Sequence, residues 1–289
     1  MNIVIVGNCQ ARPLKDIIET ISSTVKVIST PIVHLLKDED EHSVAADLER
    51  ADLIITQLIA DNYPCHFIQT NILKINYPAK VLTILNLFYS GYTPDWMYVR
   101  IPSKGTLKGP MGDYHNSTII ESWLNNRTVS ETADLLFDKE YNFTRYNAAV
   151  IASMDELALR EQHVDVNIVD FISNNLSKTR LFFTFNHPCL ALLIEYAKRI
   201  LEKMNISPDN EENIVRMDEP LNQFIPPLNP GVDFDFPIIK EFKGQEVTSI
   251  NGNEIITSGK KIYSPDEIVS LYFSIYEQNA MIIRDKYGS

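Results

Sequence analysis

The chain has 289 residues, of which 45% are hydrophobic, and this is enough to form one large domain or a domain with an appended part. Its formal net charge is -12, so its overall field repels phosphate backbones and anionic lipid surfaces. These values favour a folded chain over a disordered one. They also argue against a role in binding nucleic acids or membrane surfaces.

The N-terminus does not have the pattern of a secretory signal. It lacks basic residues, and its apolar run, Ile3–Val6, is shorter than the ~7–15 residues that such a signal needs. No uncharged apolar run approaches the ~18 residues of a membrane span. The cysteines Cys9, Cys65 and Cys189 form no CxxC pair, which argues against a disulfide framework and a zinc site. We therefore expect a cytoplasmic protein with reduced thiols and no metal.

The first half of the chain alternates between short apolar strands and helices. The run Ile3–Val6 ends at Gly7, and apolar residues then recur at helical spacing from Leu14 to Ile21. Three further strands are predicted: Val25–Ser29, Leu53–Thr56 and Val81–Leu85. This alternation is typical of a parallel sheet covered on both faces, so we expect a three-layer, flavodoxin-like α/β core.

A long loop is predicted from Pro94 to His115, where the sequence becomes rich in proline, glycine and lysine. Loops of this length are often functional. Arg100, Lys104 and Lys108 form a basic cluster in an acidic chain, which suits a phosphorylated ligand or, alternatively, a solvated loop.

Two helices after this loop are predicted from capping-box sequences at Thr128–Glu131 and Ser153–Glu156. Another strand is predicted at Leu181–Phe185, and the next residues, Asn186-His187-Pro188, precede a helix with a clear apolar stripe. The strand–turn–helix unit at the N-terminus is thus predicted to recur at His187.

The composition changes after Asn205 to a proline-rich, acidic segment. A hairpin is predicted around Asn251-Gly252, and the sequence Ser264-Pro-Asp-Glu267 predicts the start of a final helix. We therefore expect a catalytic or ligand-binding α/β domain in residues 1–205 and a C-terminal extension in residues 206–289.

Cys9 is the best nucleophile candidate, because it lies in the turn between the first strand and its helix. Unpaired N–H groups and the helix dipole at such a turn stabilise anions, lower the pKa of a thiol and can hold a phosphate or an oxyanion. The alternative is a small, buried, apolar cysteine. The turn lacks the Gly-x-Gly-x-x-Gly pattern of dinucleotide-binding proteins.

His187 is predicted to follow a strand of the same sheet as Cys9, so both would lie at the carboxyl ends of strands, where α/β proteins bind ligands. A thiol, a histidine and a carboxamide such as Asn186 or Asn8 are the parts of an activated-nucleophile site with an oxyanion donor. The alternative for His187 is a histidine that caps its own helix.

Other polar side chains are predicted near the same edge. Gln57 and Asn86 each follow a strand, so they can donate to a bound carbonyl or phosphate or simply stabilise their turns. Asp113 and His115 can form an acid/base pair or ordinary polar contacts within the loop.

Three separate motifs together resemble the WcbI-type capsular polysaccharide biosynthesis proteins: Gly7–Ala11, Gly109–His115 and Phe182–Pro188. The resemblance covers about residues 1–205 and implies a fold similar to the SGNH hydrolases, coenzyme A binding and acetyl transfer in building bacterial surface polysaccharide. In the SGNH pattern Gly-Asp-Ser follows the first strand, whereas here Cys9 replaces the serine. The usual Asp-x-x-His block is missing, and Asn186-His187 stands in its place.

The resemblance implies transfer of an acyl group, with acetyl as the first candidate, from acyl-CoA to a sugar hydroxyl. Cys9 would be the nucleophile or a pocket thiol, and His187 the general base, with a covalent and a direct route equally open. The sequence leaves homo-oligomer formation open. The expected oxyanion donors are the backbone N–H groups of Asn8–Gln10 with Gln57 or Asn86. Coenzyme binding is expected from Gly7, Arg12, Lys15, Arg100, Lys104 and Lys108.

Two other classes of function fit the same residues. An esterase or thioesterase would use this constellation with water as the acceptor. A non-catalytic module would bind coenzyme A, a nucleotide or a glycan without any reaction at Cys9 or His187.

Overall fold

The computed structural model describes residues 1–102, 105–232, 234 and 237–288. Lys104, which is predicted to bind the coenzyme, lies outside the described residues. The chain divides into two compact units, each built from three segments. The first unit comprises residues 1–88, 155–176 and 188–220, and the second comprises residues 89–154, 177–187 and 221–289. These units are defined by contacts and not by function, so the predicted domain and extension stay a prediction.

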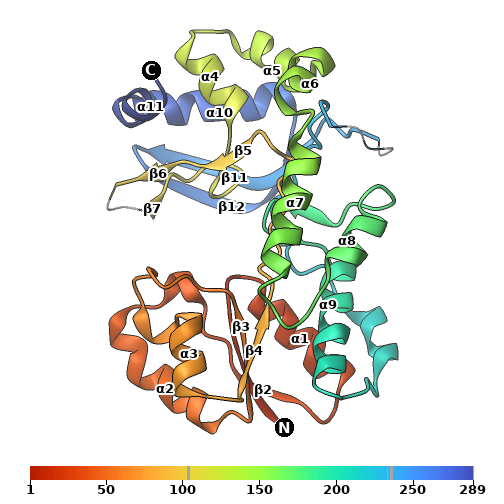
Figure 1. Cartoon of the computed structure of the whole chain (residues 1–289). Coiled ribbons are helices and arrows are strands. Elements are labelled where there is room, and N and C mark those ends of the chain that lie inside the picture. Colours follow the sequence, from red (N-terminus) through yellow and green to blue (C-terminus); the bar gives the residue numbers. More distant parts are fainter. Residues whose placement is uncertain (103–104, 233, 235–236, 289) are drawn as a thin grey trace. The chain divides into compact units, whose positions relative to one another are not determined.

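The first unit contains the predicted parallel sheet, with strand order β2-β1-β3-β4 (Figure 1). Residues Ile3 to Val6 of the central strand β1 are at most 1% exposed, as expected for a strand covered on both faces. The α/β fold with a parallel sheet is therefore confirmed. The strands are β1 (Asn2–Val6), β2 (Lys26–Ser29), β3 (Leu53–Gln57) and β4 (Val81–Ile84).

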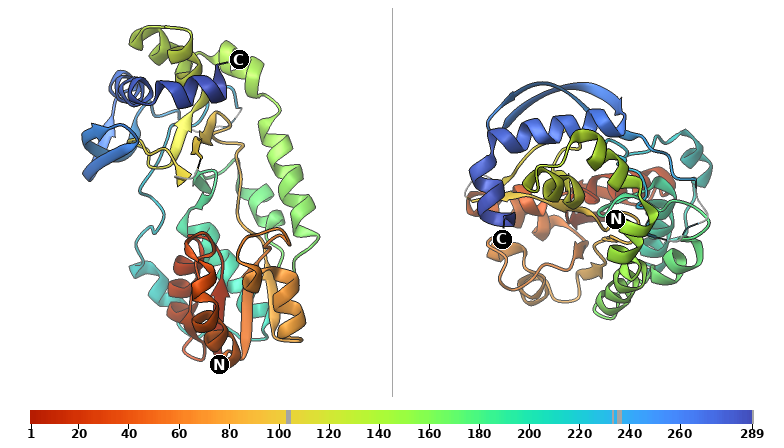
Figure 2. Two further views of the ribbon diagram at one scale, coloured as in Figure 1. Left: turned by 90° about the vertical axis from the view of Figure 1, so that its left-hand side faces the viewer. Right: turned by 90° about the horizontal axis from the view of Figure 1, so that it is seen from above.

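Helices cover both faces of this sheet (Figures 1 and 2). On one face, Val44, Leu48 and Leu73 form a core cluster with residues of β1 and β3. On the other face, α1 packs against α9. The helices of the unit are α1 (Ala11–Ile21), α2 (Glu41–Arg50), α3 (Thr70–Asn76), α8 (Val169–Asn175) and α9 (Leu190–Lys203). Short 3₁₀ segments lie at η1 (Val33–Leu35), η2 (Asp38–Asp40), η3 (His66–Ile68) and η4 (Glu211–Arg216).

The second unit combines helices with two-stranded sheets. The helix α10 packs against α4, α5 and the β11–β12 hairpin (Figure 2). Its helices are α4 (Ser117–Leu124), α5 (Val129–Phe137), α6 (Lys139–Tyr146), α10 (Pro265–Gln278) and α11 (Ala280–Tyr287), and α7 (Ala149–Glu161) has residues in both units. The strand pairs are β5 (Trp96–Tyr98) with β8 (Tyr114–Asn116), β6 (Arg100–Ile101) with β7 (Gly105–Thr106), and β11 (Phe242–Asn251) with β12 (Glu254–Tyr263).

Local sequence signals in the second unit are mostly confirmed. The hairpin turns at Gly252, whose φ of 60° suits glycine, and the capping boxes at Thr128 and Ser264 are both present. The predicted capping box at Ser153 is wrong, because α7 begins at Ala149 and Ser153 lies inside it. Alanines before Ser153 favour the earlier start, and the Ser153 hydroxyl instead accepts a hydrogen bond from the Ser90 N–H at 2.9 Å.

The strand before His187 does not belong to the parallel sheet. Instead β9 (Phe182–Thr184) pairs with β10 (His187–Pro188), because the chain reverses at Phe185 and Asn186. The prediction that His187 follows a strand of the same sheet as Cys9 is therefore wrong. Beside β4, a parallel bridge between Ile84 and Val166 extends the sheet instead.

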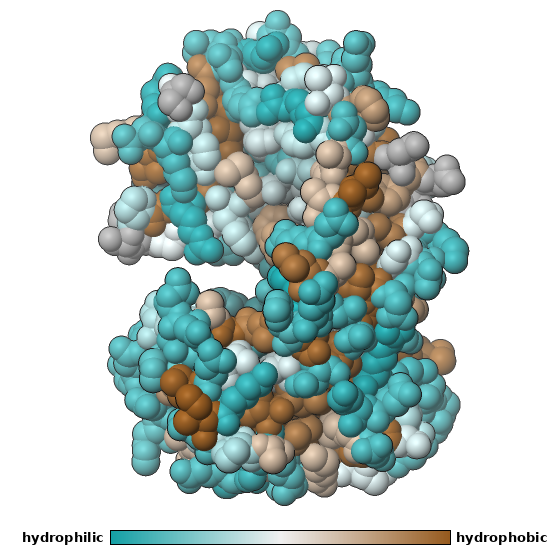
Figure 3. All heavy atoms as spheres, viewed as in Figure 1, coloured by the Kyte–Doolittle hydropathy of each residue, from teal (hydrophilic) through white to brown (hydrophobic). Residues whose placement is uncertain are grey.

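On the face shown in Figure 3, hydrophilic residues predominate, and the hydrophobic areas are small and separated. Individual apolar side chains such as Val215 and Met281 are strongly exposed. Within the described ranges, no helix is both long enough and apolar enough to cross a lipid bilayer.

Candidate functional site

The turn between β1 and α1 is held by backbone bonds and by Gln57. The Val33 N–H donates to the Gly7 carbonyl at 2.9 Å, and the Asn8 N–H donates to Gln57 Oε1 at 2.9 Å. A Cβ at Gly7 would lie only 3.0 Å from the same Gln57 oxygen. Glycine at this position therefore makes room for the side chain that orders the turn.

Four carboxamide side chains join the ends of β1, β3 and β4. Asn8 Nδ2 donates to Asn86 Oδ1 at 2.9 Å, and Gln57 Nε2 donates to Gln10 Oε1 at 3.0 Å. Gln10, which is fully buried, also donates from Nε2 to the Leu87 carbonyl at 2.7 Å. The prediction that Gln57 and Asn86 reach the same edge as the first turn is confirmed.

This network leaves specific donors for a ligand. The N–H groups of Asn8 and Gln10 are already bonded, to Gln57 Oε1 and to Asn8 Oδ1 respectively. In the part of the chain that the structure describes, the Cys9 N–H has no acceptor beyond its own sulfur, and Asn86 Nδ2 has none. Gln57 Nε2, another expected donor, is also bonded, to Gln10 Oε1 and Asn8 Oδ1. An oxyanion role for the Cys9 N–H and the Asn86 amide stays a prediction.

Arg160 also supports this edge of the sheet, although no local sequence pattern predicts this role. Its Nη1 donates to the Asn86 carbonyl and its Nη2 to the Phe88 carbonyl, both at 3.0 Å. Burial lowers the pKa of Arg160. An arginine four residues after Glu156 on a helix is typical of a surface ion pair, so only the tertiary structure reveals this role.

The Cys9 thiol is half-buried, and burial raises its pKa to about 11. The hydrogen bond from its own N–H lowers the pKa by less. The predicted lowering of the pKa at this turn is therefore wrong, because the loss of water around a thiolate outweighs the local donor. At neutral pH Cys9 is a neutral thiol.

The two other cysteines lie in more apolar surroundings. Cys65 and Cys189 are buried, and burial raises the pKa of each thiol. Cys65 also donates to the Leu36 carbonyl at 3.3 Å. Cys9 is therefore the cysteine with the best access to a ligand.

His187 lies in the second unit beside Tyr114 and Asn186. The Tyr114 hydroxyl donates to Asn186 Oδ1 at 2.6 Å and lies 3.3 Å from His187 Nε2. Burial lowers the pKa of His187 to about 4, so the imidazole is neutral at physiological pH. Its Nδ1 is buried and has no hydrogen-bond partner within the described residues.

Asp113 and His115 each have partners other than one another. Asp113 accepts from Lys108 Nζ at 2.5 Å. His115 is fully buried, with Nε2 at 3.0 Å from the Leu107 carbonyl and Nδ1 at 3.0 Å from the Tyr276 hydroxyl. Both groups therefore stabilise the 105–115 segment.

The other residues that are predicted to bind coenzyme A belong partly to the first unit and partly to the second. Arg12 is exposed and Lys15 half-buried on α1, in the first unit. In the second unit Arg100 is exposed and lies over the Tyr98 ring, with 5.6 Å from Cζ to the ring centroid. Contact of these residues with coenzyme phosphates stays a prediction.

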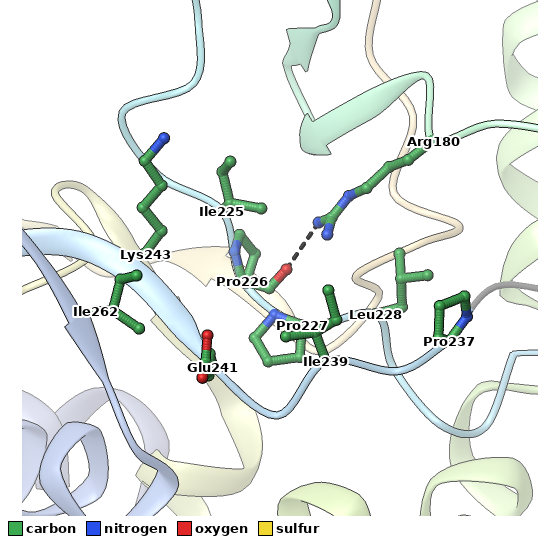
Figure 4. Close-up of a pocket in the computed structure, with 10 residues that line it drawn as sticks. All are labelled: Arg180, Ile225, Pro226, Pro227, Leu228, Pro237, Ile239, Glu241, Lys243 and Ile262. Atoms are coloured by element: carbon green, nitrogen blue, oxygen red, sulfur yellow. Dashed lines mark hydrogen bonds between the residues drawn. The ribbon is translucent and has the colours of Figure 1, made fainter.

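A cavity of about 390 Å³ lies within the second unit, lined mainly by proline and aliphatic side chains (Figure 4). Arg180 points toward its wall and donates to the carbonyl groups of Phe182, Phe183 and Pro226 at 2.7–3.0 Å. Burial lowers the pKa of Arg180 to about 10. The guanidinium thereby connects β9 to the proline-rich segment.

The fold and the turn at Cys9 define an α/β protein with an accessible cysteine between its first strand and helix. The family model described as polysaccharide biosynthesis enzyme WcbI matches residues 2–209. The chain therefore belongs to the WcbI family of polysaccharide biosynthesis enzymes. The resemblance found in the three sequence motifs is confirmed.

A solved structure of a WcbI polysaccharide biosynthesis enzyme has the same fold, with a TM-score of 0.69 and 18% identity over 99% of both chains. It is described as the native protein without a disulfide bond between coenzyme A and one of its cysteines. No curated protein matches the present chain.

Proposed function

We propose that this enzyme transfers an acyl group, with acetyl as the first candidate, from an acyl-CoA to a sugar hydroxyl. The observation that carries the proposal is the turn at Cys9, where the Cys9 N–H and the Asn86 amide are left for a ligand at the edge of a parallel sheet. The related WcbI structure is described by the absence of a disulfide bond between coenzyme A and one of its cysteines, and this mention of coenzyme A supports the choice of donor.

The two free donors suit the carbonyl oxygen of a thioester, which gains negative charge when a nucleophile attacks. In the direct route, the sugar oxygen forms a bond to the acyl carbon and the bond from that carbon to the coenzyme sulfur breaks. His187 takes the proton of the hydroxyl and returns a proton to the leaving thiolate.

The pKa of about 11 for Cys9 favours this direct route over a covalent one, because a neutral thiol is a weak nucleophile. Cys9 then lines the pocket beside the coenzyme sulfur. Arg12 and Lys15 on α1 would hold the coenzyme phosphates, whereas the Gly7 N–H predicted for this role already donates to the Pro31 carbonyl at 3.2 Å. Arg100 and Lys108 are further candidates for the same phosphates.

The proposal is tested by incubating the protein with acetyl-CoA, with and without a panel of sugars, and measuring free coenzyme A and acetylated sugar by mass spectrometry. We expect coenzyme release that depends on the sugar and that is nearly lost in His187→Gln. Intact-protein mass gives the route: an acetylated protein that disappears in Cys9→Ser would contradict direct transfer.

Two other results would support the competing functions. Acetate release at the same rate with and without sugar would indicate a thioesterase. Tight binding of coenzyme A with no release of product from any sugar would indicate a binding module. Cys65→Ser is the matched control, because that thiol is buried and donates to the Leu36 carbonyl.

A further inference from the structure

We propose that Tyr114 is a positioning residue that holds His187 in the tautomer protonated at Nε2, so that Nδ1 is the atom that accepts the proton in catalysis. The catalytic part rests on the proposed function. The tautomer itself is a property of the protein without substrate and can be tested separately.

The Tyr114 hydroxyl has a single proton to donate. A carboxamide oxygen only accepts hydrogen bonds, and Asn186 Oδ1 lies 2.6 Å from the Tyr114 hydroxyl. The Thr184 hydroxyl donates to the same oxygen at 3.1 Å, which agrees with an acceptor at that position. The Tyr114 proton is therefore directed to Asn186.

The Tyr114 hydroxyl has a second neighbour, the imidazole of His187. His187 Nε2 lies 3.3 Å from the Tyr114 oxygen, and because the phenol proton is used, the imidazole must be the donor in this bond. A neutral imidazole carries one N–H, so Nδ1 holds a lone pair. This nitrogen is buried and, among the described residues, has no hydrogen-bond partner.

Tyr114 is itself held in place by the groups around it. Tyr114 is 4% exposed, and its ring packs edge-on against Phe185 and Phe224, with centroids 5.1 and 5.9 Å away. Its backbone carbonyl accepts from the Tyr272 hydroxyl at 2.5 Å. A rigid phenol holds the imidazole in one orientation, as a catalytic base requires.

A second pair of tyrosine and histidine in the same unit gives a matched control. His115 Nε2 donates to the Leu107 carbonyl, so its Nδ1 accepts from the Tyr276 hydroxyl. Tyr276→Phe removes a buried tyrosine hydroxyl from a buried histidine, as Tyr114→Phe does, but at a histidine whose two nitrogens are both satisfied.

The test is ¹⁵N NMR of the histidine side chains in the full chain at neutral pH, with the His187 signals assigned from their loss in His187→Gln. We expect the wild type to show a protonated Nε2 and an unprotonated Nδ1 at His187. In Tyr114→Phe the two nitrogens should shift toward a mixture of tautomers, and the kcat of acyl transfer should fall ~10-fold with little change in KM. Tyr276→Phe should change neither the tautomer of His187 nor the kcat of acyl transfer.

A protonated Nδ1 at His187 in the wild type would overturn the inference, and so would an unchanged tautomer in Tyr114→Phe. If Tyr114→Phe does not fold, Asn186→Leu supplies the second test. Without its acceptor, the Tyr114 proton should turn to His187 Nε2 and move the imidazole proton to Nδ1. Absence of acyl transfer in the wild type would count against the proposed function, while the nitrogen signals would still decide the tautomer.

Discussion

The second unit contains two buried histidines that look alike by burial and differ in their hydrogen bonds. Burial lowers the pKa of both His115 and His187 to about 4. Both ring nitrogens of His115 have partners, whereas Nδ1 of His187 has none within the described residues. Because buried polar groups are almost always satisfied, this exception supports the proposal that His187, and not His115, is kept for a ligand.

The difference in hydrogen bonding between His115 and His187 predicts different roles in stability and in catalysis. A histidine with two internal partners contributes to folding and has no lone pair left for a substrate. A histidine with an unsatisfied nitrogen costs stability and offers a proton acceptor. We therefore expect substitutions at the two positions to affect different measurements.

The largest expected effect is on catalysis at His187. His187→Gln should lower the rate of acyl transfer ~10³-fold, because the general base is lost, while the free energy of unfolding changes by less than about 1 kcal/mol. Initial rates of coenzyme release and urea unfolding measure the two quantities. A variant that unfolds easily but retains its rate would reverse the assigned roles.

The next largest effect is on stability at His115. His115→Gln should lower the free energy of unfolding by about 2–3 kcal/mol, because it leaves the Leu107 carbonyl and the Tyr276 hydroxyl without the ring that joins them. The rate per folded molecule should stay within about twofold of the wild type. A large loss of rate with unchanged stability would contradict a structural role.

Part of this picture could be predicted from the sequence, where the signal is local. Apolar strands alternating with helices predicted the parallel sheet, and the positions of Gln57 and Asn86 directly after strands predicted that both reach the edge beside Cys9. The hairpin at Gly252 follows from its turn residues. Each of these depends on neighbours in the chain.

The remainder depends on tertiary contacts that no local pattern encodes. Phe182–Thr184 has the composition of a core strand, but its pairing with His187–Pro188 is decided by the turn between them. The pKa of Cys9 is set by the groups that bury it, and these outweigh the donor at the turn. Arg160 reaches the site from a helix distant in sequence.

A smaller effect is expected in the pH dependence of stability. A folded-state pKa of about 4 for His115 lies below the usual value of 6.5, so the unfolded chain binds this proton first as the pH falls. The contribution of His115 is complete above pH 6.5 and is lost toward pH 4, which amounts to about 2 kcal/mol between pH 6.5 and 5. Urea midpoints across this range should fall less steeply in His115→Gln.

The smallest effect is expected at Cys9, and it bears on whether the base acts on the sugar or on the thiol. If His187 takes its proton from a sugar hydroxyl, Cys9→Ser should keep the acyl-transfer rate within about threefold, because the Cys9 N–H and the Asn86 amide remain in place. If the base activates the thiol instead, the same variant should lose ~10²-fold or more. Steady-state rates with acetyl-CoA and a working acceptor distinguish these results, and Cys65→Ser controls for general thiol loss. A large loss in Cys9→Ser would mean that the high pKa of this thiol in the free protein does not persist when substrates bind.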